Sequence, residues 1–313
     1  MVNENFVVSV NMITYKHEPY IKQAIEGVLM QQTNFDYELI IADDCSPDAT
    51  QDIINDIIKK HPRGNKIKYF RHKENIGMQE NGIFAFNQCS GKYMALCEGD
   101  DYWTDPLKLQ KQVDFLEANP DYVLCFHPIN ILKKDGEIVD DFITKIPENY
   151  EILETLAKHG NYIHTPSVVF RKVITNLPFE FRLTPIGDYF LYIILAEFGK
   201  IKYLEDKMAV YRFDVGVISK MSSIDIANNN VKMYSCIIGY LKNENIKKII
   251  LDKQIKVVTE HYKMIESSCK EMVELDYKDA FVSRHFVFIK IKTLLLYYKN
   301  PKMFFNRIKR KLK

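Results

Sequence analysis

The first hundred residues of this 313-residue chain alternate short β-rich runs with amphipathic helical stretches. The β-rich runs predict four strands, over residues 6–13, 37–42, 66–71 and 92–97. Between them, residues 20–31 and 49–60 carry apolar side chains at the spacing of a helix that lies on a sheet, and a third helix is predicted after Gly77. Strands that alternate with helices in this way build a parallel sheet from βαβ units. The sequence therefore predicts an α/β fold with a mostly parallel sheet flanked by helices.

The rest of the chain continues the alternation at first and then becomes helical. Helices are predicted at 106–118, 152–158 and 188–198, and strands at 122–132, 167–171 and 202–211. From residue 222 onward the pattern predicts helices at 222–243, 246–273 and 277–298, then a short basic helix from Pro301. We therefore expect a catalytic α/β domain over residues 1–220 and a helical C-terminal region over residues 221–313.

The composition is ordinary for a soluble globular protein, with 47% hydrophobic and 27% charged residues. No segment reaches the roughly 18 uncharged apolar residues that span a bilayer. The N-terminus lacks the basic start of an export signal, so the protein is expected in the cytoplasm. Six cysteines are scattered without a metal-binding or redox spacing, and we expect them to be reduced.

Charge is distributed unevenly along the chain. Of 43 Lys and Arg residues against 41 Asp and Glu, ten basic residues and no acidic one lie in residues 280–313. Phe305, Ile308 and Leu312 recur there at helical spacing among basic side chains, which predicts an amphipathic helix on the anionic inner face of the cell membrane. A basic helix whose apolar stripe forms a homodimer is the alternative. Nothing in the body of the chain indicates base recognition, so no nucleic-acid partner is expected.

Three carboxylates lie within the four residues Glu98-Gly99-Asp100-Asp101, directly after the apolar run 93–97. An apolar run of this length is typical of a buried strand, and ligands of an open α/β sheet bind where such strands end. Neighbouring carboxylates repel one another, and a divalent cation relieves the repulsion. Hard oxygen ligands suit Mg²⁺ or Mn²⁺, which commonly take further ligands from substrate phosphates. The alternative is an acidic turn that caps a helix beginning near Asp105.

Four motifs follow one another along the chain: Val8 to Tyr15, Ala42 to Thr50, Asn75 to Gly77 and Glu98 to Asp101. Together they resemble the family 2 glycosyltransferases of the GT-A fold, over about the first 215 residues. The resemblance implies a Rossmann-like GT-A domain, here followed by a C-terminal helical extension. It also implies transfer of a sugar from a nucleotide donor. Each motif is short, and the specificity of the resemblance lies in their order and spacing.

The donor nucleotide needs an aromatic face and an acceptor for the imide or amide edge of its base. Tyr15 and Asp44 can supply these groups, and the resemblance implies that they contact uracil. The further donor-binding candidates are Thr14, Glu18, Asp43, Asn75, Gly77, Asn81 and Asp100. The alternative for Asp43-Asp44-Cys45-Ser46 is a strand-to-helix turn with a capping serine.

The resemblance implies that Asp100 and Asp101 hold the cation that binds the donor diphosphate. Glu98 stands where the family usually has an aspartate. Asp214 stands where the family commonly has a histidine, after Arg212, which is expected to meet phosphate. Whether Glu98 or Asp214 contacts the metal is left open by the sequence.

A sugar transfer to an alcohol needs a base that takes the proton of the attacking hydroxyl. Ile186-Gly187-Asp188 resembles the helix-opening segment that carries this base in the family, so Asp188 is assigned to it in an inverting displacement. The alternative role of Asp188 is an N-cap. His164 and Trp103 are expected at the acceptor, as pocket lining and as a platform for a sugar ring. For both, a structural role in the core is the alternative.

The sequence thus predicts a non-processive, inverting, metal-dependent glycosyltransferase that moves a sugar from a UDP-sugar to a hydroxyl of a glycan or lipid-linked saccharide, in bacterial surface polysaccharide synthesis. A sugar nucleotidylyltransferase is one alternative, but it should carry a glycine-rich phosphate loop where this chain has Thr14 to Glu18. The other is a non-catalytic, membrane-recruited scaffold. The presence of Asp100, Asp101 and Asp188 argues against it.

Overall fold

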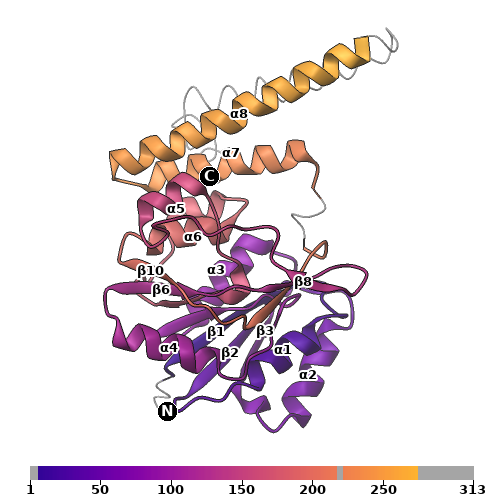
Figure 1. Ribbon diagram of the computed structural model, residues 1–313. Coiled ribbons are helices and arrows are strands. Elements are labelled where there is room, and N and C mark those ends of the chain that lie inside the picture. The colour runs from indigo at the N-terminus through magenta and orange to yellow at the C-terminus, as the bar shows by residue number, and fades with distance from the viewer. Residues whose placement is uncertain (1–5, 217–220, 274–313) are drawn as a thin grey trace. The chain divides into compact units, whose positions relative to one another are not determined.

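The computed structural model describes residues 6–216 and 221–273, whose elements are drawn in Figure 1. The strands are β1 (Val8–Thr14), β2 (Tyr37–Asp43), β3 (Ile67–Arg71), β4 (Tyr93–Leu96), β5 (Tyr102–Trp103), β6 (Tyr122–Phe126), β7 (Asn130–Leu132), β8 (Ile138–Asp140), β9 (Val169–Arg171), β10 (Lys200–Tyr203) and β11 (Ala209–Arg212). The helices are α1 (Ile21–Leu29), α2 (Thr50–Lys60), α3 (Met78–Gln88), α4 (Lys108–Ala118), α5 (Leu153–His159), α6 (Gly187–Leu195), α7 (Ser223–Tyr240) and α8 (Glu244–Val273). The described residues divide into two compact units. Those within 1–182 and 187–220 form the first, and those within 183–186 and 221–313 form the second.

The first unit is built on a seven-stranded sheet with the order β10-β6-β9-β4-β1-β2-β3. Only β9 runs antiparallel to its neighbours in this sheet, β4 and β6. The other neighbouring pairs are parallel. The mostly parallel α/β sheet expected from the sequence is therefore confirmed.

The order in which successive strands are added to the sheet reverses at β1. It steps from β1 through β2 to β3 and then returns to the other side of β1 as β4. A reversal of this kind opens a crevice at the carboxyl ends of the strands, where open α/β sheets bind ligands. The carboxyl ends of β1 and β4 meet at this point, so the residues after Thr14 and after Leu96 lie at its edge.

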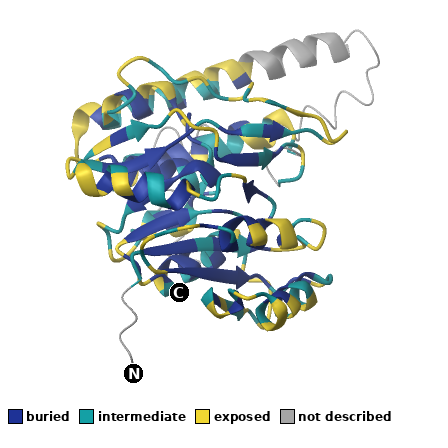
Figure 2. Ribbon diagram, turned by 60° about the horizontal axis from the view of Figure 1, so that its bottom comes forward, coloured by how far each residue is buried: buried dark blue, intermediate teal, exposed yellow. Residues whose placement is uncertain are grey.

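Helices cover the sheet because each presents one apolar face. Ile25 of α1, Ile54 of α2 and Val113 of α4 belong to one buried cluster with the side chains of β1 and β2. Contacts of α3 with β1 and β2 place that helix on the sheet as well, and Figure 1 shows it on the face away from α1, α2 and α4. Figure 2 shows the strands as the most deeply buried part of the unit. The sheet and its flanking helices thus hold the strand ends rigidly in place.

Two strands predicted as continuous are each divided between two sheets, so these predictions were wrong. Residues 122–132 form β6 in the large sheet and β7 in a four-stranded sheet with the order β5-β11-β7-β8. Pro128 lies between them, and a proline lacks the N–H that a strand needs to continue its ladder. Residues 202–211 divide likewise between β10 and β11. The second sheet brings Arg212, at the end of β11, beside the residues that precede β5.

The second unit contains the paired helices α7 and α8. Ser222 caps α7, its hydroxyl accepting from the backbone N–H of Asp225 at 3.2 Å. The side chain of Gln254 on α8 donates to the Val231 carbonyl at 2.8 Å and to the Ser235 hydroxyl at 2.7 Å, which fixes the two helices to each other. The predicted helices over 277–298 and from Pro301 lie outside the described residues. Within residues 6–216 and 221–273, no helix combines the length and apolarity needed to cross a bilayer.

Candidate active site

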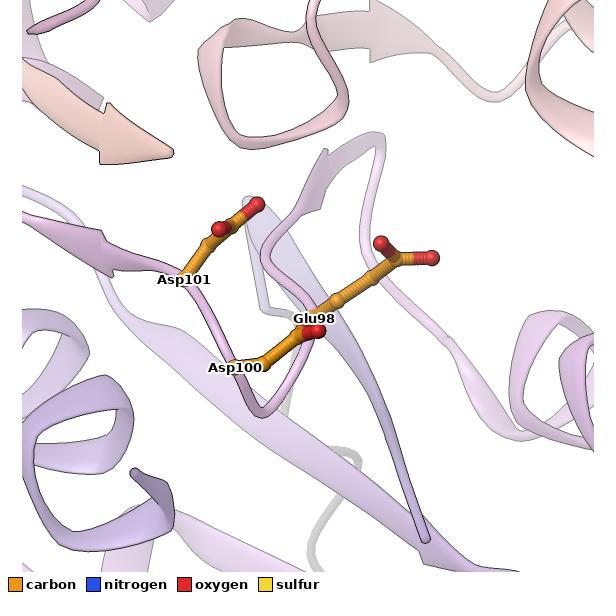
Figure 3. Close-up of side chains that lie close together, drawn as sticks. All are labelled: Glu98, Asp100 and Asp101. Carbon is orange, nitrogen blue, oxygen red and sulfur yellow. The ribbon is translucent and has the colours of Figure 1, made fainter. Parts of the chain in front are cut away.

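The acidic turn after β4 is anchored to the end of β1 by backbone hydrogen bonds. The N–H of Cys97 donates to the Asn11 carbonyl at 3.1 Å, and the N–H of Gly99 donates to the Ile13 carbonyl at 3.0 Å. Figure 3 shows Glu98, Asp100 and Asp101 extending from this single turn. One carboxylate oxygen of each lies within 4.8 Å of the others. The cluster predicted from the sequence therefore exists in space.

The local electrostatics of the turn suit a cation. Burial raises the pKa of Glu98 to about 8, and the charges of Asp100 and Asp188 add to the shift. Burial, reinforced by Asp100, also raises the pKa of Asp101. Asp101 is 1% exposed, and its Oδ2 finds no hydrogen-bond donor among the described residues. A buried carboxylate oxygen without a donor is costly, and a divalent ion bound there would satisfy it. The residues present thus fit Mg²⁺ or Mn²⁺.

Arg212 secures the turn instead of pointing freely into the crevice. Its backbone N–H donates to Oδ1 of Asp101 at 2.9 Å. Its guanidinium donates to the Asp100 carbonyl and to Oε1 of Gln23, both at 2.5 Å. The same group lies over the rings of Tyr20 and Tyr102, with its carbon 5.0 Å and 4.7 Å from their centroids. With 6% of its surface exposed, Arg212 acts first as a brace for the acidic turn.

Asp188 lies in the first turn of α6, on the same side of the unit as the acidic turn. Its Oδ1 accepts from the N–H of Tyr189 at 2.7 Å, and its Oδ2 accepts from the side-chain amide of Asn161 at 2.9 Å. Burial raises the pKa of Asp188, and these two hydrogen bonds oppose the shift. Asp188 in turn helps to raise the pKa of Glu98, so the two carboxyl groups are close enough to interact.

The pKa of the Tyr211 phenol responds to the charges of four acids near it. Burial is the main reason why the pKa of Tyr211 is raised, and the charges of Asp101, Glu98, Asp100 and Asp188 add to it. These charges place Tyr211 near the four acids, and they place Asp188 near enough to Glu98 to raise its pKa.

The predicted nucleotide residues Tyr15 and Asp44 flank the end of β1. Tyr15 is 38% exposed, and the ammonium group of Lys16 lies over its ring, 5.0 Å from the ring centroid. The N–H of Asp44 donates to the Thr14 carbonyl at 3.0 Å, which continues the β1–β2 pairing past the strand ends. The carboxylate of Asp44 accepts from the N–H groups of Ile76 and Gly77, at 2.7 and 2.9 Å, and this fixes the loop before α3. Asn75 donates its side-chain amide to the Asp44 carbonyl at 3.3 Å.

Three other donor candidates make contacts that hold the loops together. Asp43 is fully buried and accepts from the Ser46 N–H and the Tyr69 hydroxyl, both at 2.8 Å. The Ser46 hydroxyl accepts from the Lys16 N–H at 3.1 Å and does not cap α2, which the turn alternative required. Asn81 donates to the Ala42 carbonyl at 2.9 Å and contacts Nε2 of His72 at 3.0 Å. Glu18 accepts from the N–H of Ala49 at 3.1 Å. These contacts give each residue a structural reason to be present.

Trp103 and His164 are both tied into the protein. Trp103 is 2% exposed, and its indole N–H donates to the Pro166 carbonyl at 2.9 Å. A buried ring offers no face to a sugar, so the prediction of a sugar platform was wrong and the core alternative holds. His164 pairs with Asp141 through Nε2 at 3.0 Å, and its ring lies 5.5 Å from the ring of Tyr211. Asp214 is exposed and has a φ of 64°. Among the described residues, the group of carboxylates that could hold a cation includes Glu98 and does not include Asp214.

Sequence reasoning missed Asn161, Gln23, Asp141 and His17. His17 places Nε2 3.8 Å from Oδ2 of Asp100, and burial lowers its pKa against the charge of that aspartate. His17 follows the first motif by two residues, so its position near Tyr15 was a usable signal. The other three lie outside the motifs and reach the site only through the fold.

Comparison with known proteins shows which family this chain resembles in sequence and in fold. The model of the family described as Glycosyl transferase family 2 matches residues 9–177. Rv1520, an uncharacterised protein of Mycobacterium tuberculosis, is 38% identical over 204 residues, which are 65% of this chain and 58% of that protein. WfaP of Escherichia coli, a UDP-Glc:α-D-GlcNAc-diphosphoundecaprenol β-1,3-glucosyltransferase, is 27% identical over 214 residues, which are 68% of this chain and 80% of that protein.

Solved structures show the same fold at low sequence identity. TarS residues 1–349 from S. aureus, crystallised with UDP, matches with a TM-score of 0.56 at 16% identity, over 82% of this chain and 72% of that one. The mannosyltransferase PcManGT from Pyrobaculum calidifontis, in complex with GDP-Man and Mn²⁺, matches with a TM-score of 0.60 at 14% identity, over 96% and 85%. The chain spans 58% of the length of the mycobacterial relative. Because the family model covers more than half of the chain, and the fold agrees, this protein belongs to glycosyl transferase family 2 and has the GT-A fold.

Proposed function

We propose that the chain transfers a sugar from a UDP-sugar to a hydroxyl group, in an inverting reaction that depends on a divalent cation. The observation that carries this proposal is the cluster of Glu98, Asp100 and Asp101, whose carboxylate oxygens lie within 4.8 Å of one another, with Asp188 near enough to raise the pKa of Glu98. Three of these acids suit a cation, and the fourth is held separately by Asn161. A sugar transfer needs both functions at one place.

Tyr15 and Asp44 support uracil as the base. An exposed aromatic ring next to a carboxylate can stack on a base while the carboxylate accepts from an imide N–H. Of the structures above, TarS was crystallised with UDP and PcManGT with GDP-Man, so the fold accepts either base. The carboxylate of Asp44 keeps lone pairs beyond those bonded to Ile76 and Gly77, and these can accept from the imide N–H of uracil.

Asp100 and Asp101 would hold Mg²⁺ or Mn²⁺ on the donor diphosphate. When bound, the cation offsets the negative charge that develops on the departing UDP. Arg212 keeps the turn in place through the Asp100 carbonyl and the Asp101 carboxylate, so the two side chains stay directed toward the crevice.

Asp188 takes the proton from the acceptor hydroxyl as that oxygen attacks the anomeric carbon. The new bond forms between the acceptor oxygen and the anomeric carbon, the bond from this carbon to the diphosphate oxygen breaks, and UDP departs with the electron pair. Attack from the face opposite the leaving group inverts the anomeric configuration. Asn161 and the Tyr189 N–H fix both carboxylate oxygens of Asp188 in the position this step requires.

We further propose that the acceptor is a glycan or a lipid-linked saccharide in the synthesis of a bacterial surface polysaccharide. WfaP, a relative, acts on GlcNAc-diphosphoundecaprenol. The basic residues in 280–313 support attachment of the C-terminal region to the anionic cytoplasmic face of a membrane, with residues 1–220 as the catalytic domain. A homodimer through the same segment remains the alternative, and vesicle sedimentation together with light scattering distinguishes the two.

The decisive experiment measures UDP release from UDP-glucose and UDP-GlcNAc, with GDP-mannose as the competing donor. We expect release of UDP with Mn²⁺ or Mg²⁺ and none with EDTA. Asp188→Asn should bind UDP normally and lose turnover by a factor of about 10² to 10⁴. Unchanged turnover in Asp188→Asn would refute the assignment of the base. Pyrophosphate formation from UTP and a sugar phosphate would identify a nucleotidylyltransferase, and UDP-sugar binding without any turnover would identify a scaffold.

A further inference from the structure

The imidazole of His17 faces the acidic turn without bonding to it. Its Nε2 lies 3.8 Å from Oδ2 of Asp100, which is beyond hydrogen-bonding distance. The side chains of His17 and Asp100 are 20% and 13% exposed, so both are largely shielded from water. The space between Nε2 of His17 and Oδ2 of Asp100 is therefore open to an atom that binds both.

The position of His17 is fixed by its backbone. The N–H of His17 donates to the Thr50 hydroxyl at 3.1 Å at the start of α2. Its carbonyl accepts from the N–H groups of Tyr20 and Ile21, at 2.9 and 2.8 Å, where α1 begins. These bonds tie the backbone of His17 to the starts of α1 and α2. They fix the point from which the imidazole extends.

The other ring nitrogen of His17 has an unusual environment. Both Nδ1 of His17 and the hydroxyl oxygen of Thr14 are buried without a hydrogen-bond partner among the described residues. Both also approach Gly99, where a Cβ atom would meet them at 2.8 and 2.9 Å. The glycine thus leaves room for the imidazole and the hydroxyl on the same side of the acidic turn.

We propose that Nε2 of His17 is a ligand of the cation at the acidic turn and shares it with Asp100, with the Thr14 hydroxyl orienting the ring through Nδ1. This inference rests on the cation site of the proposed function. Donor atoms that each lie about 2.1 Å from one ion can be at most about 4.2 Å apart. The observed 3.8 Å falls within this limit, so one ion can bridge His17 and Asp100 with both side chains where they are.

A nitrogen ligand changes which ion the site prefers. Oxygen ligands alone suit Mg²⁺ and Mn²⁺ alike, whereas an imidazole favours the transition metal. The site should therefore select Mn²⁺ over Mg²⁺, and His17 should carry this selectivity. The Thr14 hydroxyl corresponds to the outer partner that ligating histidines commonly have on their second nitrogen.

Pulsed EPR of the Mn²⁺–UDP complex tests the proposal directly, because nitrogen bound to Mn²⁺ gives a measurable hyperfine coupling. We expect an imidazole coupling in the wild type that changes when the protein is made with ¹⁵N-histidine. The coupling should vanish in His17→Gln and persist in His159→Gln, a matched control at an exposed position on α5. His17→Gln should also weaken Mn²⁺ binding about 10- to 100-fold while Mg²⁺ binding changes little.

The outcomes separate this inference from the proposed function. Mn²⁺ uptake without imidazole coupling in the wild type overturns the role of His17 and leaves the cation site intact. Absence of any Mn²⁺ uptake in the presence of UDP overturns the cation site itself. Thr14→Val should retain the coupling but bind Mn²⁺ about tenfold more weakly. Wild-type affinity in Thr14→Val would overturn the orienting role of the hydroxyl.

Discussion

The side-chain amide of Asn161 donates to the carboxylate of Asp188 at 2.9 Å. The other carboxylate oxygen accepts from the N–H of Tyr189 at 2.7 Å, so both oxygens of the proposed base are held. Burial favours the protonated form of Asp188, whereas these hydrogen bonds and the charge of His164 favour the ionised form. A base must be ionised to accept a proton, and Asn161 contributes one of the hydrogen bonds that favour the ionised form.

Replacing Asn161 with Ala should shift the acidic limb of the pH–rate profile upward. The Asn161 hydrogen bond lowers the pKa of Asp188 and so opposes the rise caused by burial. Without this hydrogen bond the pKa of Asp188 rises further, and the base is protonated at higher pH. A hydrogen bond to a charged group contributes about 1.5–3 kcal/mol, which corresponds to a shift of about one to two pH units. The measurement is UDP release from pH 5 to 9. Asn176→Ala, at an exposed asparagine, is the control, and an unshifted limb in Asn161→Ala contradicts the role.

Trp103→Phe should destabilise the protein and leave donor binding unchanged. The indole N–H donates to the Pro166 carbonyl at 2.9 Å inside the core, and phenylalanine leaves that carbonyl without its donor. An unsatisfied buried acceptor costs about 1–3 kcal/mol, which urea denaturation would detect. A sugar platform would give the opposite result, namely a raised KM for the acceptor saccharide at wild-type stability.

Periodicity predicted most elements of the fold, because each helix and strand carries its own apolar pattern. The predicted helices within the described residues agree with the structure to within three residues at either end. The pattern failed between Tyr122 and Leu132 and between Lys202 and Tyr211, where apolar residues continue through a change of sheet. Which sheet a strand joins is decided by distant partners, and a local pattern contains no information about them.

The difference between local patterns and contacts with distant partners also explains which site residues could be predicted. Glu98, Asp100 and Asp101 could be predicted because their clustering along the chain is itself unusual. Asn161 could not be predicted, because its partner is 27 residues away and asparagine is common in loops. The bracing role of Arg212 depends on the carbonyl of a residue 112 positions earlier. Contacts of this kind appear only once the two sheets are assembled.

Arg212→Lys should weaken binding of Mn²⁺ and UDP together. The guanidinium donates at once to the Asp100 carbonyl and to Gln23, and a single ammonium group cannot reproduce this fork. With the turn less firmly held, we expect about a tenfold loss in affinity for UDP with Mn²⁺, which calorimetry would measure. Gln23→Ala removes one of the two contacts and should give a smaller loss. Wild-type affinity in Arg212→Lys would show that the turn needs no such brace.

Lys108→Met should stabilise the protein near pH 7 and make its stability less dependent on pH. Lys108 is fully buried, donates to Oε1 of Gln112 at 2.6 Å, and has its pKa lowered to about 7 by burial. In the unfolded chain a lysine keeps its proton up to about pH 10.4. Between pH 7 and 8.5 the unfolded state therefore binds more protons than the folded state. The free energy of unfolding of the wild type should rise with pH over this interval, approaching about 1.4 kcal/mol per pH unit.

Methionine keeps the volume of Lys108 without the charge, so the variant should lack this rise. Urea denaturation at pH 7.0, 7.8 and 8.5 measures the difference in slope. Lys111→Met on the same helix is the control. It removes a partly exposed lysine whose pKa is raised by hydrogen bonds to Asp105 and Asp206, and it should leave the slope of the wild type intact. Equal slopes in the wild type and Lys108→Met would mean that Lys108 keeps its proton in the folded protein, with Gln112 and the face of Trp103 sufficient to hold the charge.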